Sequence, residues 1–164
     1  MKLIVNVDRN WNIGCDNGLL FSIPEDMKFF RQTTTGKVVV MGRKTLDSFP
    51  GGRPLKNRVN IVLTRDSSFE REGTLVCHSV QEVFDAVKDY NTDDVFVIGG
   101  ESVYKMFLDS CDTAIVTHVD AVADKADKKF PDLSALPEWK LASQSEIKED
   151  GGYKFRFCEY KKEL

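Results

Sequence analysis

The chain has 164 residues, of which 41% are hydrophobic and 30% charged, and these values are typical of one globular domain spanning residues 1–164. The net charge of −3 argues against a nucleic-acid partner, because that affinity depends on Lys and Arg neutralising phosphates. No apolar run approaches the roughly 20 residues that cross a bilayer, so no membrane partner is expected. The short apolar stretch at the N-terminus is interrupted by Asp8, unlike a signal peptide.

The cysteines indicate a reducing environment. Cys15, Cys77, Cys111 and Cys158 are widely spaced and form no C-x-x-C pair. We therefore expect free thiols in the cytoplasm rather than a disulfide framework. No metal site is predicted, since the 2 histidines offer few nitrogen ligands. We expect the protein to act as a monomer.

Short apolar or alternating runs along the chain predict strands. They cover residues 3–8, 37–41, 59–64, 75–78, 95–98, 113–120, 141–148 and 153–161. The early runs are almost continuous in Val and Ile, which is typical of strands buried on both faces. The last two flank Asp150-Gly151-Gly152, a hairpin signal.

Helical patterns lie between the early strands, over residues 24–33, 79–88 and 100–108. Ser22 is a candidate N-cap for the first pattern, with Pro24 near its first turn. Ser79 and Glu82 have the spacing of a capping box at the start of the second. Its apolar positions fall on one helical face.

The order of these elements predicts the fold class. Strands alternate with helices and are followed by a closing hairpin, so we expect an α/β domain. Its central sheet is predicted to be mostly parallel and eight-stranded, with an antiparallel C-terminal hairpin at the edge and about four flanking helices. Segment 120–138 is charged and contains proline, so it is predicted to be a surface loop.

The first predicted helix places a carboxylate among apolar side chains. Asp26 and Phe30 share one side of this helix because they are four residues apart, and Met27 lies nearby. Burial raises the pKa of a carboxyl group, and such groups concentrate at functional sites. The alternative is a solvated aspartate that complements the helix dipole.

Two strands end in glycine directly before a predicted helix. Gly42 precedes Arg43, and Gly99-Gly100 precedes Glu101. Helix N-termini bind anions, and glycine lets the backbone approach them, so both junctions suit phosphates. Arg43 could hold a phosphate bidentately. The full G-x-G-x-x-G fingerprint is absent, and ordinary strand–helix junctions remain the alternative.

Together these segments resemble the dihydrofolate reductase family. The motifs are I-G-C-D-N-G, I-P-E-D-M-K-F-F, M-G-R-K-T, R-P-L-K-N-R, V-L-T-R and V-I-G-G-E-S-V-Y. They run in order from Leu3 to about Asp120, and the match continues more loosely to the end. The resemblance implies NADPH-dependent reduction of dihydrofolate to tetrahydrofolate, with hydride added to pterin C6 and a proton to N5. It also implies that antifolate inhibitors bind.

The resemblance implies a set of substrate contacts. Asp26 matches the carboxylate that holds the pterin ring nitrogen and amino group, and Thr117 matches the hydroxyl that supports it. Arg58 matches the arginine that pairs with the glutamate tail of the substrate, and Arg31 is placed for a looser contact. The implied apolar side-chain contacts are Val5, Met27, Phe30, Phe49 and Leu55. The backbone carbonyls of Ile4 and Ile98 are implied at the pterin edge.

The resemblance also implies the cofactor site. Gly42-Arg43-Lys44-Thr45 and Gly99-Gly100-Glu101-Ser102 resemble two phosphate-binding turns, the second with a cis peptide between its glycines. The resemblance also implies residues that would bind the 2′-phosphate of the cofactor: Arg43, Thr64, Arg65 and His78. Such contacts would favour NADPH over NADH. The remaining implied cofactor residues are Asn6, Ile13, Gly14, Gly18, Leu19, Leu63, Ile98, Val103 and Tyr104, the last beside the nicotinamide. Segment 10–20 resembles the mobile lid of the family.

The implied mechanism relies on Asp26 to favour a protonatable pterin, while the proton itself arrives through water. The chain departs from the family pattern near this centre. Leu19-Leu20-Phe21 stands where Leu-Pro-Trp is usual in the family. The resemblance therefore places Leu20 and Phe21 at catalytic positions, but Phe21 lacks the N–H donor of the usual indole. Ser22 is the only nearby hydroxyl. Asn6 replaces a small residue, usually Ala, and brings an amide to the pocket floor.

Other functions stay open at this point. A reductase of the same fold acting on the riboflavin-pathway pyrimidine would share the phosphate turns but not the set of Asp26, Phe30 and Arg58. A non-catalytic nucleotide-binding module would need no buried carboxylate. A structural or interaction protein is disfavoured, because no exposed apolar stripe is evident.

Overall fold

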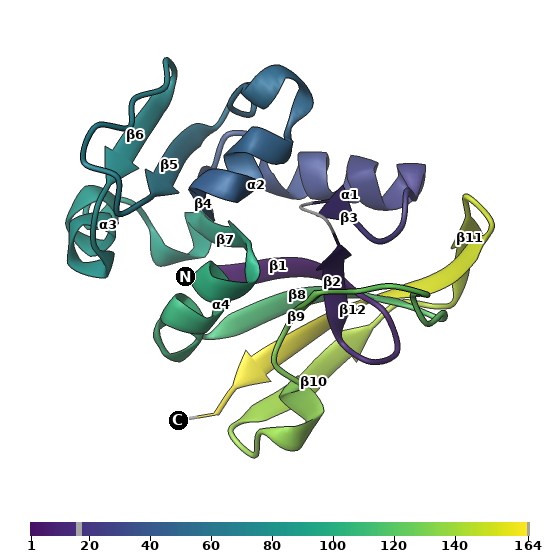
Figure 1. Cartoon of the computed structure of the whole chain (residues 1–164). Coiled ribbons are helices and arrows are strands. Elements are labelled where there is room, and N and C mark those ends of the chain that lie inside the picture. Colours follow the sequence, from purple (N-terminus) through teal and green to yellow (C-terminus); the bar gives the residue numbers. More distant parts are fainter. Residues whose placement is uncertain (16–17, 164) are drawn as a thin grey trace.

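The computed structural model describes residues 1–15 and 18–163, and Figure 1 shows their path. Positions 16 and 17, which belong to the predicted lid and to the I-G-C-D-N-G motif, lie outside the described residues. The main sheet has the strand order β10-β12-β8-β1-β7-β4-β5-β6, and β11 pairs with β12 alone. The strands are β1 (Lys2–Val7), β4 (Val38–Gly42), β5 (Val59–Leu63), β6 (Thr74–Cys77), β7 (Val95–Gly99), β8 (Thr113–Val119), β10 (Trp139–Gln144), β11 (Lys148–Asp150) and β12 (Tyr153–Lys162).

The sheet is mixed but mostly parallel. Every pairing from β8 through β1, β7, β4 and β5 to β6 is parallel, while β12 runs antiparallel to β8, β10 and β11. The predicted fold class is confirmed, but the main sheet has nine strands in the described residues rather than the eight predicted. The single strand predicted over 141–148 is wrong: the register shifts between Leu141 and Ser143, and the Ser145 hydroxyl accepts a hydrogen bond from the Phe157 backbone N–H. The segment therefore divides into β10 and β11.

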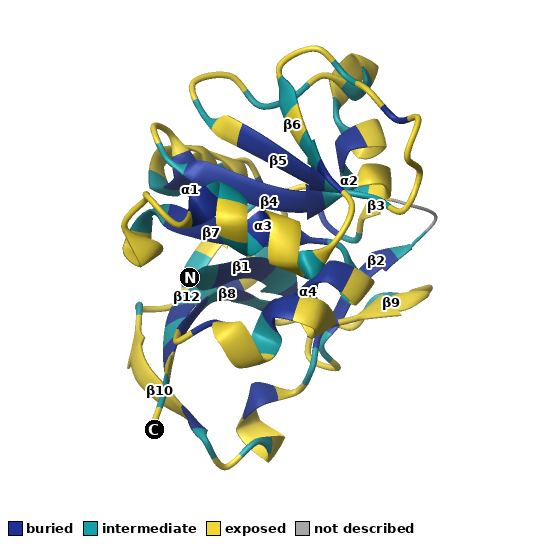
Figure 2. Cartoon of the chain, turned by 90° about the vertical axis from the view of Figure 1, so that its left-hand side faces the viewer, coloured by how far each residue is buried: buried dark blue, intermediate teal, exposed yellow. Residues whose placement is uncertain are grey.

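Four α-helices are present in the described part of the chain: α1 (Pro24–Thr34), α2 (Arg43–Ser48), α3 (Val80–Val87) and α4 (Glu101–Phe107). Short 3₁₀ turns cover Pro50–Gly52, Thr92–Asp94, Leu108–Ser110 and Leu133–Ala135. Phe29 and Phe30 of α1 and Leu46 of α2 pack on one face of the sheet, while α3 and α4 pack on the other. Figure 2 shows central strands such as β4 and β7 as the buried layer, with β10 and the outer sides of the helices exposed.

The helix caps follow the sequence in one case and depart from it in another. Ser79 caps α3 as predicted, because its side chain accepts a hydrogen bond from the Glu82 N–H. Ser22 does not cap α1, which starts after Ile23 without a side-chain cap. The Glu25 N–H instead donates to Asp150 Oδ2, at 2.7 Å. The first turn of α1 is therefore satisfied by a residue 125 positions away.

That residue belongs to the hairpin between β11 and β12. Gly151 and Gly152 form its two-residue turn with φ of 61° and 84°, as the left-handed turn of a tight hairpin requires. A Cβ at Gly151 would lie 2.9 Å from the Ser22 carbonyl oxygen. The hairpin thus packs closely against the start of α1.

A second, small sheet is formed by β3 (Gly18–Leu19), β2 (Asn12–Cys15) and β9 (Lys128–Lys129). Part of the predicted lid is therefore strand. The prediction that 120–138 is only a surface loop is wrong, because this segment contains β9 and two core side chains. Phe130 is 2% exposed and Leu133 is fully buried; the many charges around them obscured this in the sequence.

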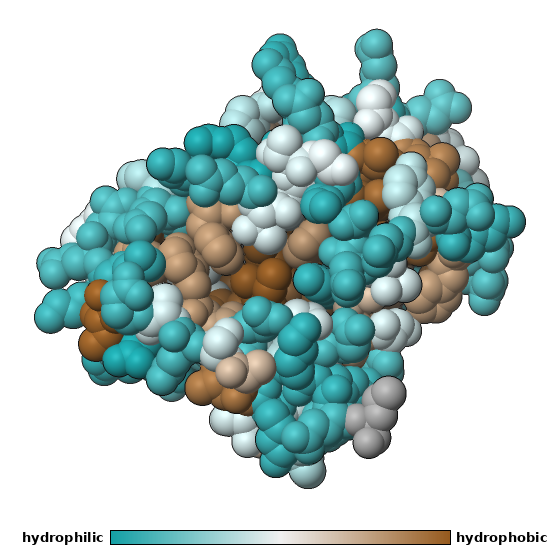
Figure 3. Space-filling model, turned by 180° about the vertical axis from the view of Figure 1, so that it is seen from behind, coloured by the Kyte–Doolittle hydropathy of each residue, from teal (hydrophilic) through white to brown (hydrophobic). Residues whose placement is uncertain are grey.

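The surface carries one notable apolar feature. Seen from behind, apolar side chains are exposed in a hollow at the centre of the molecule, framed by hydrophilic residues (Figure 3). No helix in the described residues is long and apolar enough to cross a membrane.

Candidate active site

Asp26 lies in the first turn of α1 and meets two neighbouring strands. Thr117 of β8 donates its hydroxyl to Asp26 Oδ1 at 2.6 Å, and Asn6 of β1 donates its amide Nδ2 to Asp26 Oδ2 at 2.9 Å. Asn6 and Thr117 are directly paired in the parallel register, so their side chains leave the same face of the sheet. Burial raises the pKa of Asp26, while the hydrogen bonds from Thr117 and Asn6 oppose that shift. The solvated alternative for Asp26 does not apply.

An apolar wall adjoins this carboxylate. Five of the predicted substrate contacts share one cluster on the α1 side of the sheet: Ile4, Phe30, Phe49, Leu55 and Ile98. Met27 follows Asp26 and is 55% exposed, which leaves it available to a ligand. The structure therefore brings a half-buried carboxylate and an apolar cluster together.

Val5 and Tyr104 lie elsewhere. Both side chains belong to the cluster on the opposite face of the sheet. Val5 points there because successive residues of a strand point to opposite sides, and Tyr104 lies on α4, which packs on that face. The Tyr104 hydroxyl donates to the backbone carbonyl of Ile4 at 2.7 Å. The carbonyl that we expected at the pterin edge is therefore already held in place by Tyr104.

At the far end of the wall two guanidinium groups gather. Arg58 donates its Nε to the Lys56 carbonyl at 2.9 Å and its Nη1 to the Thr34 hydroxyl at 3.1 Å. Burial, together with the charge of Arg31, lowers the pKa of Arg58. Because like charges are held near each other here, this end of the apolar wall suits a carboxylate.

Sequence reasoning missed the residue that shapes this loop. Asn60 is 3% exposed and forms hydrogen bonds with both backbone groups of Leu55 at 2.9 Å, and with the Arg58 carbonyl at 3.1 Å. A polar residue within the apolar run of β5 was the available signal, since a buried amide needs partners.

The two glycine turns lie next to each other. β4 and β7 are parallel neighbours, with Met41 paired to Gly99, so α2 and α4 begin at the same edge of the sheet. The peptide between Gly99 and Gly100 is cis, as the resemblance implied, and Gly99 has a φ of 129°. A Cβ at Gly42 would lie 3.1 Å from Val103 Cγ2, and one at Gly100 would lie 3.6 Å from Thr45 Oγ1. Bare backbone at both turns fits a diphosphate.

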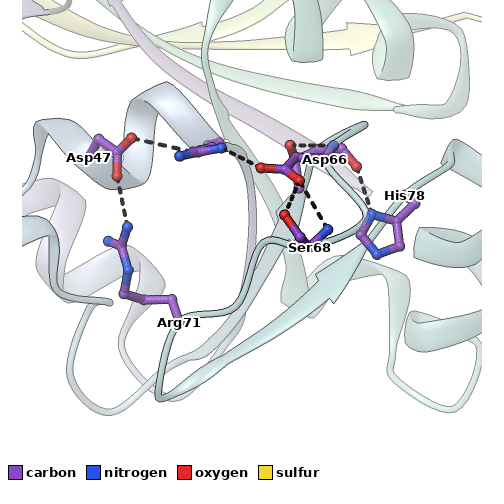
Figure 4. Close-up of polar contacts among 7 residues, drawn as sticks. Asp47, Asp66, Ser68, Arg71 and His78 are labelled. Carbon is purple, nitrogen blue, oxygen red and sulfur yellow. Dashed lines mark hydrogen bonds and ion pairs between the residues drawn. The ribbon is translucent and has the colours of Figure 1, made fainter.

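A cluster of polar and charged side chains lies beside α2 (Figure 4). Arg43 is exposed, ion-paired to Asp66 at 2.9 Å and to Asp47 at 3.7 Å, and its guanidinium lies 4.7 Å from the Phe69 ring centroid. His78 Nδ1 lies 2.9 Å from the Thr64 carbonyl oxygen. The predicted residues Arg43, Thr64 and His78 therefore occupy one region of the surface, with two carboxylates that the prediction omitted.

The remaining predicted cofactor residues lie on the surface, at the start of α4, in the main core and in the small sheet. Lys44, Arg65 and Ser102 are exposed. The Glu101 carboxylate accepts a hydrogen bond from the Lys129 N–H of β9 at 2.6 Å, which ties α4 to the small sheet. The side chains of Ile13 and Leu63 pack against the main core cluster, Gly14 and Gly18 lie in β2 and β3, and Leu19 is 73% exposed.

The segment before α1 lines a small cavity of about 330 Å³. Leu20 and Phe21 contribute to its wall together with Tyr153, whose ring centroid is 4.8 Å from that of Phe21. Phe21 is 9% exposed. The aromatic character expected at this position is kept.

Asp8, which lies just before the predicted lid segment 10–20, is a further residue that the sequence did not point to. Asp8 is 1% exposed and accepts hydrogen bonds from the Asn10 and Asn12 backbone N–H groups. It also accepts from the Asn12 side chain and from the Ala123 N–H. Asp8 thus joins β2 to the segment after β8.

Comparisons with known proteins identify the family. A family model described as Dihydrofolate reductase matches residues 1–162. Dihydrofolate reductase of Haemophilus influenzae is 40% identical over 140 residues, covering 85% of this chain and 83% of that protein. The Staphylococcus aureus (strain Mu50) enzyme is 34% identical over 150 residues, covering 92% and 89%. The solved dihydrofolate reductase of Enterococcus faecalis, complexed with NADP(H) and RAB-propyl, has a TM-score of 0.87 and 31% identity, covering 98% of this chain and 95% of that one.

Fold, glycine turns and family match together define an NADPH-dependent oxidoreductase of the α/β class. Within that class, the chain belongs to the dihydrofolate reductase family, whose reaction is the reduction of dihydrofolate with NADPH. The riboflavin-pathway alternative is not favoured.

Proposed function

We propose that dihydrofolate binds between α1 and the sheet, with its pterin ring at Asp26 and its glutamate tail at Arg58. The single observation that carries this assignment is the pairing of Asp26 with Thr117 at 2.6 Å beside an otherwise apolar wall. A carboxylate in such a place is costly unless a ligand uses it. The 2-amino group and ring N–H of a pterin are donors that match its two oxygens.

The order of groups along the apolar wall supports the orientation. The carboxylate lies at one end, the aromatic and aliphatic side chains of Phe30, Phe49 and Leu55 follow, and Arg58 lies beyond them near Arg31. Pterin, benzoyl ring and glutamate have the same sequence of chemical properties. Positioning of this kind supplies a large part of the rate enhancement in two-substrate reactions.

NADPH supplies the hydride. We assign its diphosphate to the turns at Gly42 and Gly99-Gly100, where bare backbone would face it, and its 2′-phosphate to the region of Arg43, Thr64, Arg65 and His78. Asp66 now holds Arg43 at 2.9 Å, so a phosphate must replace this carboxylate as the partner of Arg43. Asp26 keeps a negative charge near the pterin and thereby favours its protonated form, with the proton itself arriving through water.

We further propose that antifolates occupy the same site and that the protein acts as a cytoplasmic monomer, with neither nucleic acid nor membrane as partner. The thiols of Cys77, Cys111 and Cys158 are free, which agrees with a reducing compartment. Sedimentation at micromolar concentration tests the oligomeric state; a dimer would contradict the proposal.

The central test is hydride transfer in a single turnover, followed at 340 nm with NADPH and dihydrofolate, for wild type and for Asp26→Asn. The variant keeps the size of the side chain but not its charge, so its rate at neutral pH should fall by about 10²–10⁴-fold. The rate should recover partly as pH falls, because solution protons reach the substrate. Binding of NADPH serves as the control and should be unchanged. A variant as fast as wild type at neutral pH would remove Asp26 from the mechanism.

A further inference from the structure

Asn6 occupies an unusual place for a strand amide. It lies on β1 in register with Thr117, and its Nδ2 donates to Asp26 Oδ2 at 2.9 Å. Thr117 contacts the other carboxylate oxygen. Each oxygen of Asp26 thus has one donor from the protein, and the two donors come from adjacent strands.

This arrangement constrains the orientation of the carboxylate. Rotation about the terminal bond of an aspartate is broad when one hydrogen bond holds it. Asn6 and Thr117 donate to different oxygens of Asp26, and the pairing of β1 with β8 fixes both donors. The carboxylate is therefore held in one plane. Each oxygen has a second lone pair, so a ligand can still bond to both.

Asn6 also acts on the charge of Asp26. In the described residues the influences on its ionisation are burial, the Thr117 hydroxyl and the Asn6 amide, with no contribution from a charged side chain of α1, β1 or β8. An amide N–H can only donate, so it favours the ionised carboxyl over the neutral form. These two donors oppose the effect of burial on the pKa of Asp26.

We propose that Asn6 is a positioning residue for Asp26: its amide fixes the plane of the carboxylate and favours the ionised form before a ligand arrives. The proposal rests on the assignment of Asp26 as the pterin-binding group. It gives Asn6 a role in the reaction although it need not contact the reacting atoms.

The test is the ¹³C carboxyl titration of Asp26 in the complex with NADP⁺, with the signal assigned from Asp26→Asn. Asn6→Leu keeps the volume and excludes water but removes the donor, so the midpoint should move to higher pH. Loss of one hydrogen bond to a charged group corresponds to at least about a tenfold rise in proton affinity. Asn6→Ala should shift the midpoint in the same direction, and Asn6→Asp further, because a like charge is added.

The matched control is Asn91→Ala, which removes an amide that caps a distant 3₁₀ turn and should leave the midpoint unchanged. If Asn6 only fills space, Asn6→Leu will titrate as wild type does, and the proposal is overturned. Should Asn6→Leu fail to fold, Asn6→Ala decides the question: an unchanged or lowered midpoint overturns the proposal. The titration needs no turnover, so its result is independent of whether Asp26→Asn proves inactive.

Discussion

Two aspartates in this molecule, the half-buried Asp26 and the buried Asp8, have opposite electrostatic settings. Around Asp26 burial outweighs two hydrogen bonds and raises the pKa. Around Asp8 burial also raises the pKa, but hydrogen bonds from Ala123, Asn12 and Asn10 outweigh it, and the net shift is downward. The ionised Asp26 side chain therefore lowers the stability of the folded protein, whereas the ionised Asp8 side chain contributes to it.

This contrast predicts that replacing each aspartate by asparagine changes the free energy of unfolding in opposite directions. The folded protein binds a proton at Asp26 more tightly than the unfolded chain does, so stability falls as pH rises from the ordinary value of 3.8 through the raised one. Asp26→Asn removes the buried charge and should stabilise the free protein at pH 7, within the ~0.5–3 kcal/mol typical of single substitutions. Below the ordinary pKa the gain should disappear. Urea unfolding across pH measures this.

Asp8→Asn is the matched comparison. Its stabilising contribution is present above the ordinary pKa and is lost as pH falls through the lowered one. The variant should therefore be less stable than wild type at pH 7, with the difference shrinking in acid. If both variants shift stability in the same direction at pH 7, the assigned settings are incorrect.

The role of Arg58 can be tested by comparing two ligands, one with and one without the glutamate tail. Arg58→Leu should raise the KM for dihydrofolate far more than it weakens a pterin without the glutamate tail, because charge-assisted bonds to the tail are worth about 1.5–3 kcal/mol. Titration of both ligands gives the comparison. Equal losses for the two would indicate that Arg58 only braces the loop through Lys56 and Thr34.

Among the elements, α1 depends on contacts outside its own sequence. Its N-terminal N–H groups lack a local side-chain cap, and Asp150 takes over this role from the β11–β12 hairpin. The helix that carries Asp26 is therefore placed by the last strands of the chain as well as by the apolar face beneath it.

Removing this cap should lower stability measurably. Asp150→Ala leaves the Glu25 N–H without its acceptor, which typically costs about 1 kcal/mol and, in a domain of this size, lowers Tm by about 2–4 °C. Asp150→Asn keeps an acceptor oxygen and serves as the control. Identical melting of the Ala and Asn variants would show that the contact with Glu25 has no stabilising effect.

For the whole molecule, local patterns were enough to predict the parallel sheet, the closing hairpin and the paired glycine turns. These depend on neighbours in sequence, such as the Val-rich runs of β4 and β7 or the Asp150-Gly151-Gly152 turn. The cap of α1, the Asn60 contacts and the buried Phe130 depend on partners far along the chain, which periodicity does not encode. Likewise, the family resemblance implied that Asn6 lies near the site, but its bond to Asp26 depends on the register of β1 with β8.

The bond between Glu25 and Asp150 has a consequence for the kinetics of folding. The two residues are 125 positions apart, so their contact closes a long loop, and contacts of this kind slow folding. In a refolding experiment we therefore expect the Glu25 amide to gain protection from hydrogen exchange no earlier than the β11–β12 hairpin docks against α1.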